Sequence, residues 1–379
     1  MPVNVVPKLH DDDEELIRKC AIELVFRDSH RRPRTRCDVY VRPLGRRGYT
    51  DSRLYRVAFN HERSRPFVIK TDVHSEMERE AEGITKARNL KGTESAERYP
   101  SDGVCEAIMY PLISQSGGVD DITELADLMY ASQRSRLPRR AASVRTLASL
   151  YDTIGAGNPS VPSTIVYGQE YRRYLRERSR SRKLLNPLSD FFPNDRSESR
   201  HGRLVLRNPR RILERVKAQQ VESIVRHVHG DLHPKNVLID DRRHPNMIDF
   251  AYGDDRGHWI KDFVLMECSV RFVEPPRLLD ADALREADAA LLQEHGTHRV
   301  RAIAEGTSTR TGAVLREMAD LVETIRARCR TCHPDYDFEE YLTATYLILM
   351  GCIRLVSYQD LRVMLALCEL ADHLEPRLA

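Results

Sequence analysis

The chain lacks most of the features that would set it apart from ordinary globular proteins. Only one of its 379 residues is a tryptophan, and its 60 basic and 57 acidic residues leave a net charge of +3. This near balance argues against a dedicated nucleic-acid binder, although it leaves local basic patches open. No run approaches the roughly 18 apolar residues that a membrane span requires, so no membrane partner is expected.

Export signals and solenoid repeats are also missing. The N-terminal sequence MPVNVVPKLHDDDEEL turns acidic where a signal peptide would need an apolar core. Eight cysteines are scattered along the chain, mostly in apolar contexts that are typical of reduced, packed thiols. The five in apolar contexts are Cys20, Cys105, Cys268, Cys352 and Cys368. We therefore expect a cytoplasmic protein, and its length favours two lobes or domains over one small core.

The first third of the chain has the pattern of strands, and most of the remainder has that of helices. The N-terminal residues carry a helical pattern over EELIRKCAIELVF, 14–26. From Cys37 onwards, CDVYVRPLG, RLYRVAFN and PFVIK are typical of short strands, as is EAIMYPLIS at 106–114. Between the last two, HSEMEREAEGITKARNL predicts a helix with an acidic first turn. Beyond residue 114 we expect a helical, arginine-rich body that one strand–loop–strand segment interrupts.

That segment concentrates polar side chains between short apolar runs. HVHGDLHPKNVLID, residues 227–240, is followed closely by MIDF, residues 247–250. The runs VLI and MID can pair as a hairpin that brings Asn236 and Asp249 together, while the preceding loop projects Asp231. Carboxylate and amide oxygens are the ligands that Mg²⁺ prefers. Phosphoryl transfer needs such ligands, a carboxylate at the acceptor hydroxyl, a cation on the nucleotide phosphates and a flexible cover.

HGDLHPKN followed by IDF resembles the catalytic signature of the protein-kinase-like phosphotransferases, and more narrowly that of the aminoglycoside phosphotransferase and choline kinase branch. The separations from Asp231 to Asn236 and from Asn236 to Asp249 match the family. The resemblance implies that Asp231 is the catalytic carboxylate and that Asn236 and Asp249 hold Mg²⁺. It implies that His229 braces this catalytic loop, and it leaves the role of His233 open. An ordinary hairpin with a His-rich turn is the alternative, but it does not account for so many matched positions.

The strand-rich third offers residues for binding the nucleotide. Lys70 ends the apolar run of VIK, where the family places the lysine that contacts the α- and β-phosphates. The resemblance of MEREAEG to the family makes Glu80 the expected partner of Lys70, with Glu76, one turn earlier, as the alternative. The ordinary explanation for Lys70 is a surface lysine at the end of a strand, and that for the glutamates is a solvated helix face. We expect the second explanation to hold for Glu78 and Glu82.

The loop GRRGYTDS lies where the family covers the phosphates. It lacks a full GxGxxG pattern, so the phosphates would be held by Gly45, Gly48, Ser52 and nearby backbone amides, and a plain hairpin turn is the alternative. The strand EAIMYPLIS would lead into the hinge between the lobes. The residues whose backbone is expected near the adenine are Met109, Tyr110 and Leu112.

The residues after IDF limit the kind of acceptor. Asp262 matches the family's aspartate that braces the catalytic loop, and only 251–261 lie between it and IDF. A protein kinase uses this interval for a long activation segment that docks a peptide, so its shortness favours a small-molecule or other non-peptide acceptor. Arginine-rich stretches within 172–217 disfavour a polycationic aminoglycoside and favour a neutral or anionic acceptor. A solvated helix face also explains them.

Together these patterns predict an α+β, bilobal protein-kinase-like fold. A helical extension (1–36) precedes a small antiparallel-sheet lobe with the hinge (37–113) and a large, mainly helical lobe (114–379) that carries the catalytic loop at 227–250. The expected activity is Mg²⁺-dependent transfer of the γ-phosphoryl group of ATP, with GTP not excluded, to a hydroxyl of a small molecule or other non-peptide acceptor.

A second resemblance rests on HGDLHPKNVLIDD together with MIDFAYGDDRGHWIKDFVLMECSVRF. These segments also resemble the ternary-complex-associated domains, which are kinase-like domains of bacterial conflict and signalling systems. The alternative function is therefore a nucleotide-binding pseudokinase or assembly module with protein partners. The non-ideal glycine loop keeps this alternative open, while the intact set of Lys70, Asp231, Asn236 and Asp249 favours catalysis.

A further motif, CRTCH at 329–333, has the spacing of a c-type haem attachment site and of half a zinc site. Haem attachment would require export, and no second CxxC completes a zinc site. Buried or surface thiols are therefore the expected explanation. RSRSRK lacks the interleaved aromatic residues of a single-stranded RNA binder.

Overall fold

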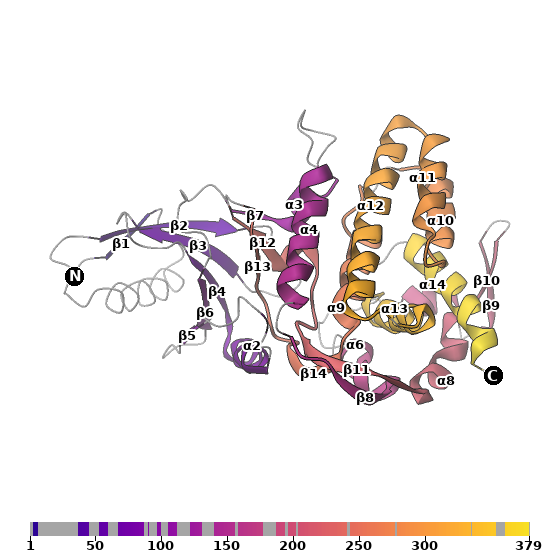
Figure 1. Ribbon diagram of the computed structural model, residues 1–379, viewed down its shortest axis with the longest axis horizontal. Helices are drawn as coiled ribbons and strands as arrows, with labels where there is room; N and C mark the ends of the chain where they lie inside the picture. The colour runs from indigo at the N-terminus through magenta and orange to yellow at the C-terminus, as the bar shows by residue number, and fades with distance from the viewer. Residues whose placement is uncertain are drawn as a thin grey trace.

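A sheet and a body of packed helices occupy the two ends of the computed structural model (Figure 1). The arrangement confirms the expected α+β fold with a strand-rich lobe and a mainly helical lobe. The residues that the structure describes are 3–6, 37–44, 53–59, 67–86, 90, 97–99, 105–111, 122–130, 140–155, 158–176, 187–193, 196–201, 204–240, 243–276, 279–334, 336–353 and 361–378.

The first lobe is built on a six-stranded sheet of order β1-β2-β3-β4-β6-β5. Its strands are β1 (Val3–Val6), β2 (Cys37–Leu44), β3 (Arg53–Phe59), β4 (Phe67–Val73), β5 (Glu97–Tyr99) and β6 (Cys105–Pro111). All neighbours pair antiparallel except β1 and β2. The sheet therefore begins earlier than expected, because Val3–Val6 of the extension form its edge strand. The helix expected at 14–26 lies outside the described residues.

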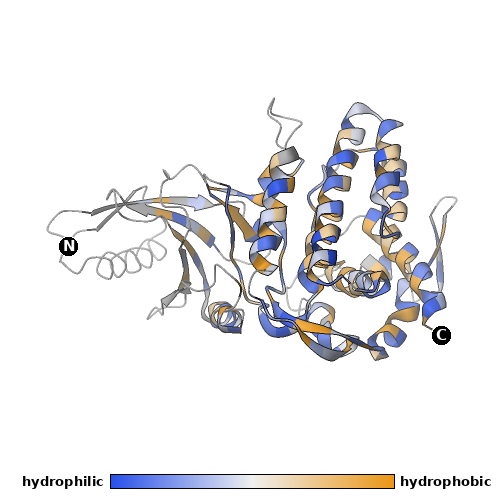
Figure 2. Ribbon diagram, viewed as in Figure 1, coloured by the Kyte–Doolittle hydropathy of each residue, from blue (hydrophilic) through white to orange (hydrophobic). Residues whose placement is uncertain are grey.

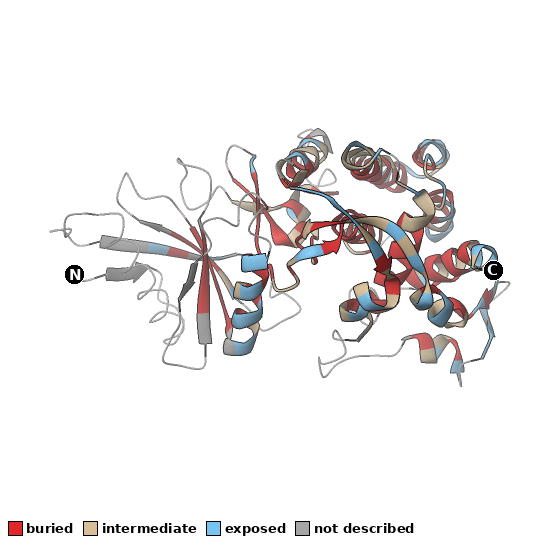
Figure 3. Ribbon diagram, turned by 60° about the horizontal axis from the view of Figure 1, so that its bottom comes forward, coloured by how far each residue is buried: buried red, intermediate tan, exposed pale blue. Residues whose placement is uncertain are grey.

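Helix α2 (His74–Lys86) follows β4 directly and presents one side to the lobe and the other to solvent (Figure 3). Met77, Glu80 and Ile84 are buried, while Glu78 and Glu82 are exposed. The acidic first turn and the lysine in the last turn complement the helix dipole. This orientation turns Glu80 inward, towards the strand that carries Lys70.

The second lobe is mainly helical, with apolar and hydrophilic residues alternating along its long helices (Figure 2). Its helices are α3 (Leu125–Leu128), α4 (Arg140–Gly155), α5 (Tyr167–Glu170), α6 (Arg172–Arg176), α7 (Pro187–Phe191), α8 (Leu213–Ala218), α9 (Lys261–Phe272), α10 (Ala281–Ala290), α11 (Thr297–Glu305), α12 (Thr309–Cys332), α13 (Phe338–Cys352) and α14 (Leu361–Leu374). Every residue of α9 is buried, so this helix is the centre of the lobe. None of the described helices combines the length and apolar character that crossing a bilayer requires.

A cluster of charged side chains within this core is paired around Glu267. Arg326 donates to both oxygens of Glu267, at 2.9 and 2.7 Å, and Arg271 donates to the same carboxylate at 3.1 Å. The hydroxyl of Tyr341 adds a fourth bond at 2.7 Å. Burial alone would raise the pKa of Glu267, but the arginines outweigh it and lower the pKa. The cluster joins α9, α12 and α13 through one carboxylate.

Strands in the second lobe are more numerous than the sequence predicts. They form the sheets β14-β11-β8 and β13-β12-β7 and the hairpin β9–β10. Their bounds are β7 (Thr123–Glu124), β8 (Val161–Val166), β9 (Glu198–His201), β10 (Leu204–Arg207), β11 (Gln220–Val228), β12 (Val237–Ile239), β13 (Pro245–Met247) and β14 (Asp254–His258). Residues 200–217, which belong to the body expected to be helical, are helical only in their last part, because the β9–β10 hairpin precedes the turn at Pro209–Ile212 and α8.

Candidate active site

The loop between β11 and β12 carries the residues expected to be catalytic. Its second residue is Gly230, whose φ of 75° is unfavourable for residues with a side chain. A Cβ there would lie 2.2 Å from the carbonyl oxygen of Tyr252. Glycine is therefore required at this position both by the backbone conformation and by the close approach of a second chain segment.

Asp262 holds this loop from the first turn of α9. Its two carboxylate oxygens accept hydrogen bonds from the backbone amides of His229, at 2.8 Å, and Gly230, at 2.9 Å. On the other side of the loop, the hydroxyl of Tyr174 in α6 donates to the carbonyl of Gly230. Because α9 is buried along its whole length, Asp262 fixes the loop to the core of the lobe.

His229 is fully buried and connects the loop to the residues before Asp249. The backbone amide of Asp231 donates to His229 Nδ1 at 3.3 Å, so the proton of the neutral ring is on Nε2. Nε2 in turn donates to the carbonyl of Ile248, 2.9 Å away. Both ring nitrogens are thus used within the fold, which is the bracing position that the sequence suggested for this residue.

Asn236 and Asp249 are brought together by the β12–β13 hairpin. Val237 pairs with Met247, and the amide of Ile248 donates to the carbonyl of Asn236 at 3.0 Å. The side-chain Nδ2 of Asn236 donates to the carbonyl of Asp231 at 2.9 Å. The side-chain oxygen, Oδ1, takes no part in this bond. The turn from Asp231 to Asn236 is therefore closed by its own side chain.

Asp249 follows the hairpin in a left-handed conformation, with φ of 67°. Its amide donates to the hydroxyl of Tyr110, at 3.2 Å, and its side chain is 29% exposed. A non-glycine residue with positive φ is uncommon and is held by its surroundings. Tyr110, from β6 of the first lobe, is one such contact.

Lys70 joins the two lobes at this point. Its Nζ lies 2.6 Å from Glu80 Oε2 and 2.8 Å from Asp249 Oδ1. The alternative partner, Glu76, instead pairs with Arg79 on the solvent side of α2, at 3.1 Å. One ammonium group, 5% exposed, is therefore shared by a carboxylate from each lobe.

The charges in this cluster respond to burial and to one another. Burial lowers the pKa of Lys70, but Asp249 and Glu80 outweigh it and raise the pKa above its usual value. Burial raises the pKa of Asp249, but the ammonium of Lys70 outweighs it and lowers the pKa. For Glu80, burial, supported by the charges of Asp249 and Asp72 and opposed by Lys70, raises the pKa to about 8. Asp249 is thus the carboxylate that keeps its charge most strongly.

Two glycines bring α2 into main-chain contact with the residues after Asp249. A Cβ on Gly83 would lie 1.6 Å from the carbonyl oxygen of Phe250, and one on Gly253 would lie 2.5 Å from the carbonyl oxygen of Gly83. The sequence analysis did not single out these glycines. The signal was present in AEGI, because a glycine inside a helix costs about 1 kcal/mol and usually has a packing reason.

The residues expected near the adenine are only partly described. Met109 and Tyr110 are both buried in β6. Met109 is flanked by Ile69 of β4 on one side and by Glu97 of β5 on the other. The remaining nucleotide residues of the sequence analysis lie outside the described residues; they are Gly45, Gly48, Ser52 and Leu112.

The side-chain oxygens of Asn236 and Asp249 are of the kind that Mg²⁺ prefers. They are hard donors, and two protein ligands suit an ion that keeps water and phosphate oxygens in its shell. Within the described parts of the chain, no group of three His, Cys, Asp or Glu side chains could hold a metal ion. In CRTCH, Cys329 is buried in α12 as a free thiol and His333 packs on Trp259, with ring centroids 5.3 Å apart. These packed positions agree with a structural role for that motif.

Glu80→Gln is expected to remove one source of pH-dependent stability. With a pKa of about 8 when folded and 4.5 otherwise, the Glu80 carboxyl contributes stability below about pH 4.5 that is lost as the pH rises through about 8. The melting temperature of the wild type should therefore fall relative to that of Glu80→Gln between about pH 5 and pH 9. Glu82→Gln, on the exposed side of α2, is the control. Parallel curves for wild type and Glu80→Gln would contradict the assignment.

The arrangement defines the class of fold. In the sheet lobe a lysine pairs with a helix glutamate, and in the helical lobe the HGDLHPKN loop is followed by the IDF hairpin. This is a protein-kinase-like fold. The chain belongs to the family described as ternary complex associated domain 9, whose model matches residues 160–350, half of the chain. The matched residues include Asp231, Asn236 and Asp249 but not Lys70 or Glu80.

Solved structures with a similar course of the chain are distant in sequence. Choline kinase LicA from Streptococcus pneumoniae is 13% identical, with a TM-score of 0.46, over 96% of this chain and 100% of that chain. A glucosamine kinase is 13% identical, with a TM-score of 0.43, over 89% and 78%. Amicoumacin kinase hAmiN, in complex with AMP-PNP, Ca²⁺ and Ami, is 12% identical, with a TM-score of 0.40, over 97% and 96%.

At these identities and TM-scores the similarity bears on neither activity nor substrate. A search of curated proteins found no match.

Proposed function

We propose that this protein is a Mg²⁺-dependent phosphotransferase that moves the γ-phosphoryl group of ATP, or GTP, to a hydroxyl of a small molecule or other non-peptide acceptor. The observation that carries the proposal is the position of Lys70, bonded at 2.6 Å to Glu80 and at 2.8 Å to Asp249. A cation so placed at the junction of the lobes suits the phosphates of a nucleotide.

The roles of the remaining residues follow from their positions. Asp231, half-buried on a braced loop, would accept the proton of the acceptor hydroxyl as its oxygen bonds to the γ-phosphorus. The bond from that phosphorus to the bridging oxygen breaks, and the nucleoside diphosphate leaves. Asn236 and Asp249 would hold Mg²⁺, which neutralises charge on the phosphates. His229 and Asp262 would keep the loop in position.

The interval between Asp249 and Asp262 supports a non-peptide acceptor. Within it, Asp254–His258 form β14, which pairs with β11 through Val228–Asp254 and Val225–His258. The interval is therefore part of the lobe's own sheet, and no long segment separates the two aspartates to dock a peptide. The arginine-rich stretches described above favour a neutral or anionic acceptor over a polycationic one.

Asp249→Ala is expected to abolish stabilisation by nucleotide. For the wild type, Mg²⁺–ATP at 100 times its dissociation constant should stabilise the fold by about 2.7 kcal/mol. Removal of the Asp249 carboxylate deletes a metal ligand and leaves Lys70 with Glu80 alone. The measurement is the rise in melting temperature on addition of Mg²⁺–ATP. Asp255→Ala, an exposed site on β14, is the matched control. An equal rise in Asp249→Ala and wild type would contradict the metal assignment.

The description of the family, a ternary complex associated domain, favours a second candidate. In this alternative the chain binds a nucleotide without turnover and serves as a regulatory or assembly module of a bacterial conflict or signalling system. Incubation with γ-labelled ATP and a pooled cell extract separates the two. Label on small molecules supports the phosphotransferase, whereas unchanged ATP despite saturable nucleotide binding supports the module.

A further inference from the structure

A buried tyrosine in α6 contacts the catalytic loop next to Asp231. The hydroxyl of Tyr174 donates to the carbonyl of Gly230, and the tyrosine is only 2% exposed. This carbonyl belongs to the peptide bond that joins Gly230 to Asp231. The hydrogen bond therefore acts on the peptide unit directly before the carboxylate that the proposed reaction uses as its base.

The bonds of Asp262 leave the orientation of this peptide unit to other contacts. Asp262 accepts from the amides of His229 and Gly230, which fixes the chain up to the nitrogen of Gly230. Beyond that atom, rotation about the ψ angle of a glycine meets little steric resistance. The amide of Asp231 donates to His229 Nδ1 at 3.3 Å, which is long for such a bond. The hydroxyl of Tyr174 therefore restrains this peptide from its carbonyl side.

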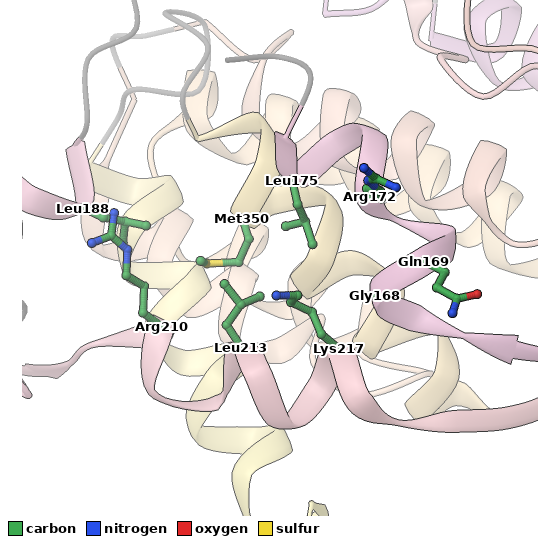
Figure 4. A pocket seen from close by; sticks show the side chains of 9 residues that line it. All are labelled: Gly168, Gln169, Arg172, Leu175, Leu188, Arg210, Leu213, Lys217 and Met350. Carbon is green, nitrogen blue, oxygen red and sulfur yellow. The ribbon is translucent and has the colours of Figure 1, made fainter.

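The main chain of Tyr174 is held against α13. A Cβ on Gly351 would lie 2.4 Å from the carbonyl oxygen of Tyr174 and 2.9 Å from its Cβ, so no side chain separates the two helices at this point. Beside this contact, Leu175 and Met350, the sequence neighbours of the two residues, line the same hollow of the helical lobe (Figure 4). Because α13 is buried from Tyr341 to Cys352, this contact ties Tyr174 to the core of the lobe.

The ring of Tyr174 is held by further neighbours. It stacks on Tyr252, with ring centroids 6.4 Å apart and an angle of 18° between the planes. The ammonium of Lys261 lies 6.0 Å from the centroid of the Tyr174 ring. Tyr252 in turn touches the catalytic loop, because a Cβ on Gly230 would lie 2.2 Å from its carbonyl oxygen. These contacts belong to the ring, so they would remain if the hydroxyl alone were removed.

We propose that Tyr174 is a positioning residue that orients Asp231 for phosphoryl transfer, an inference that rests on the proposed function. Tyr174 acts through the peptide unit between Gly230 and Asp231. Its hydroxyl fixes the carbonyl, and the carboxylate that follows is then held where it can accept the proton of the acceptor hydroxyl. Without the hydroxyl this peptide can rotate, and misplacement of a catalytic group by about 1 Å can lower a rate about 10²-fold.

Tyr174→Phe tests this role, because it removes the hydroxyl and keeps the stacked ring. Transfer of label from γ-labelled ATP to the small-molecule fraction of a pooled cell extract is followed at increasing concentrations of Mg²⁺–ATP. The maximal rate should fall at least about tenfold. The KM for ATP should change less than about twofold, since Lys70 and Asp249 keep their own ion pair.

Tyr346→Phe is the matched control. The hydroxyl of Tyr346 is also buried and also donates to a backbone carbonyl, that of Pro209, at 2.7 Å. Both variants therefore lose the same kind of bond, and both should lose similar stability. Only Tyr174→Phe should lose rate, while the rate of Tyr346→Phe should stay within about twofold of that of the wild type. Circular dichroism checks that both variants are folded.

Hydrogen exchange provides a second measurement, which needs no turnover. In Tyr174→Phe, the backbone amides of residues 229–236 should exchange at least about fivefold faster than in the wild type, as loss of a buried hydrogen bond implies. In Tyr346→Phe they should exchange at the wild-type rate.

The role of Tyr174 is overturned if Tyr174→Phe transfers label as fast as the wild type, or if Tyr346→Phe loses as much rate. A rise in the KM for ATP at an unchanged maximal rate also overturns it, because the hydroxyl would then serve nucleotide binding. Absence of transfer by the folded wild type would instead reject the proposed function. The exchange rates would then decide alone, and equal rates in the wild type and Tyr174→Phe would show that the hydroxyl does not hold the loop.

Discussion

Asp231→Asn is expected to lower phosphoryl transfer by about 10²–10⁴-fold, the usual contribution of a positioned base, and to leave nucleotide affinity unchanged. Asparagine keeps the size of the side chain but cannot accept the hydroxyl proton. The loop itself should persist, because asparagine keeps the two bonds that the backbone of this residue makes: the amide donates to His229 and the carbonyl accepts from Asn236. Single-turnover transfer of label and the dissociation constant of Mg²⁺–ATP are the two measurements.

The control for this substitution is Asp255→Asn, which makes the same chemical change at an exposed position of β14. Equal ATP consumption by wild type and Asp231→Asn would reject Asp231 as the base. Loss of nucleotide affinity in Asp231→Asn, with Asp255→Asn unaffected, would instead place Asp231 among the metal ligands.

Glu267→Ala should destabilise the helical lobe by about 3–5 kcal/mol, the range for removal of one partner from a buried ion pair. Arg326 would lose the carboxylate that accepts two of its hydrogen bonds, at 2.9 and 2.7 Å, and its guanidinium is 1% exposed. Arg271 and Tyr341 would each lose a bond as well. Urea unfolding followed by the fluorescence of Trp259, the single and fully buried tryptophan, reports on this lobe.

Glu286→Ala is the control, because Glu286 pairs with Arg299 at 3.4 Å on the surface, where a change below about 0.5 kcal/mol is expected. The lowered pKa of Glu267 adds a second signature. Its contribution is present above the unfolded pKa and is lost as the pH falls through the folded one, so wild type and Glu267→Ala should converge in acid. A destabilisation below about 1 kcal/mol at neutral pH would show that the pairs merely offset their desolvation.

The parts of the site that sequence could predict are those built from neighbouring residues. Asp231 and Asn236 lie in one turn, and the spacing to Asp249 requires only the β12–β13 hairpin. Lys70 and Glu80 are separated by the end of one strand and two turns of the next helix. In each case, alternation of apolar residues and the usual reach of a hairpin or a helix turn determine which side chains meet.

The parts that could not be predicted depend on segments far apart in the chain. Strand β8 pairs with β11, although more than fifty residues separate them, and neither Val161–Val166 nor Gln220–Val228 reveals its partner by pattern alone. The bond from the amide of Asp249 to the hydroxyl of Tyr110 joins residues 139 positions apart, and that from the hydroxyl of Tyr174 to the carbonyl of Gly230 joins residues 56 positions apart. Both tyrosines belong to elements whose own periodicity explains only their burial.

The hairpin that replaces the expected helix at 200–217 has a local cause. In this hairpin Ser199 pairs with Leu206 and Arg200 pairs with Val205. Asn208 then caps the turn at Pro209–Ile212 by accepting from the amide of Arg210 at 3.0 Å. Pro209 fits the first position of such a turn but would interrupt a helix that had begun earlier. This stretch was expected to be helical as part of the arginine-rich body, whereas Asn208 and Pro209 determine where a helix can start.

The touching backbones at Gly83 and Gly253 have a consequence for control. Because no side chain lies between them, α2 cannot move relative to this segment without separating the two main chains. The distance between Glu80 and Lys70 therefore depends on the packing of α2 against the residues after Asp249. A regulator that moved α2, and with it Glu80, away from Lys70 would first have to break this main-chain contact.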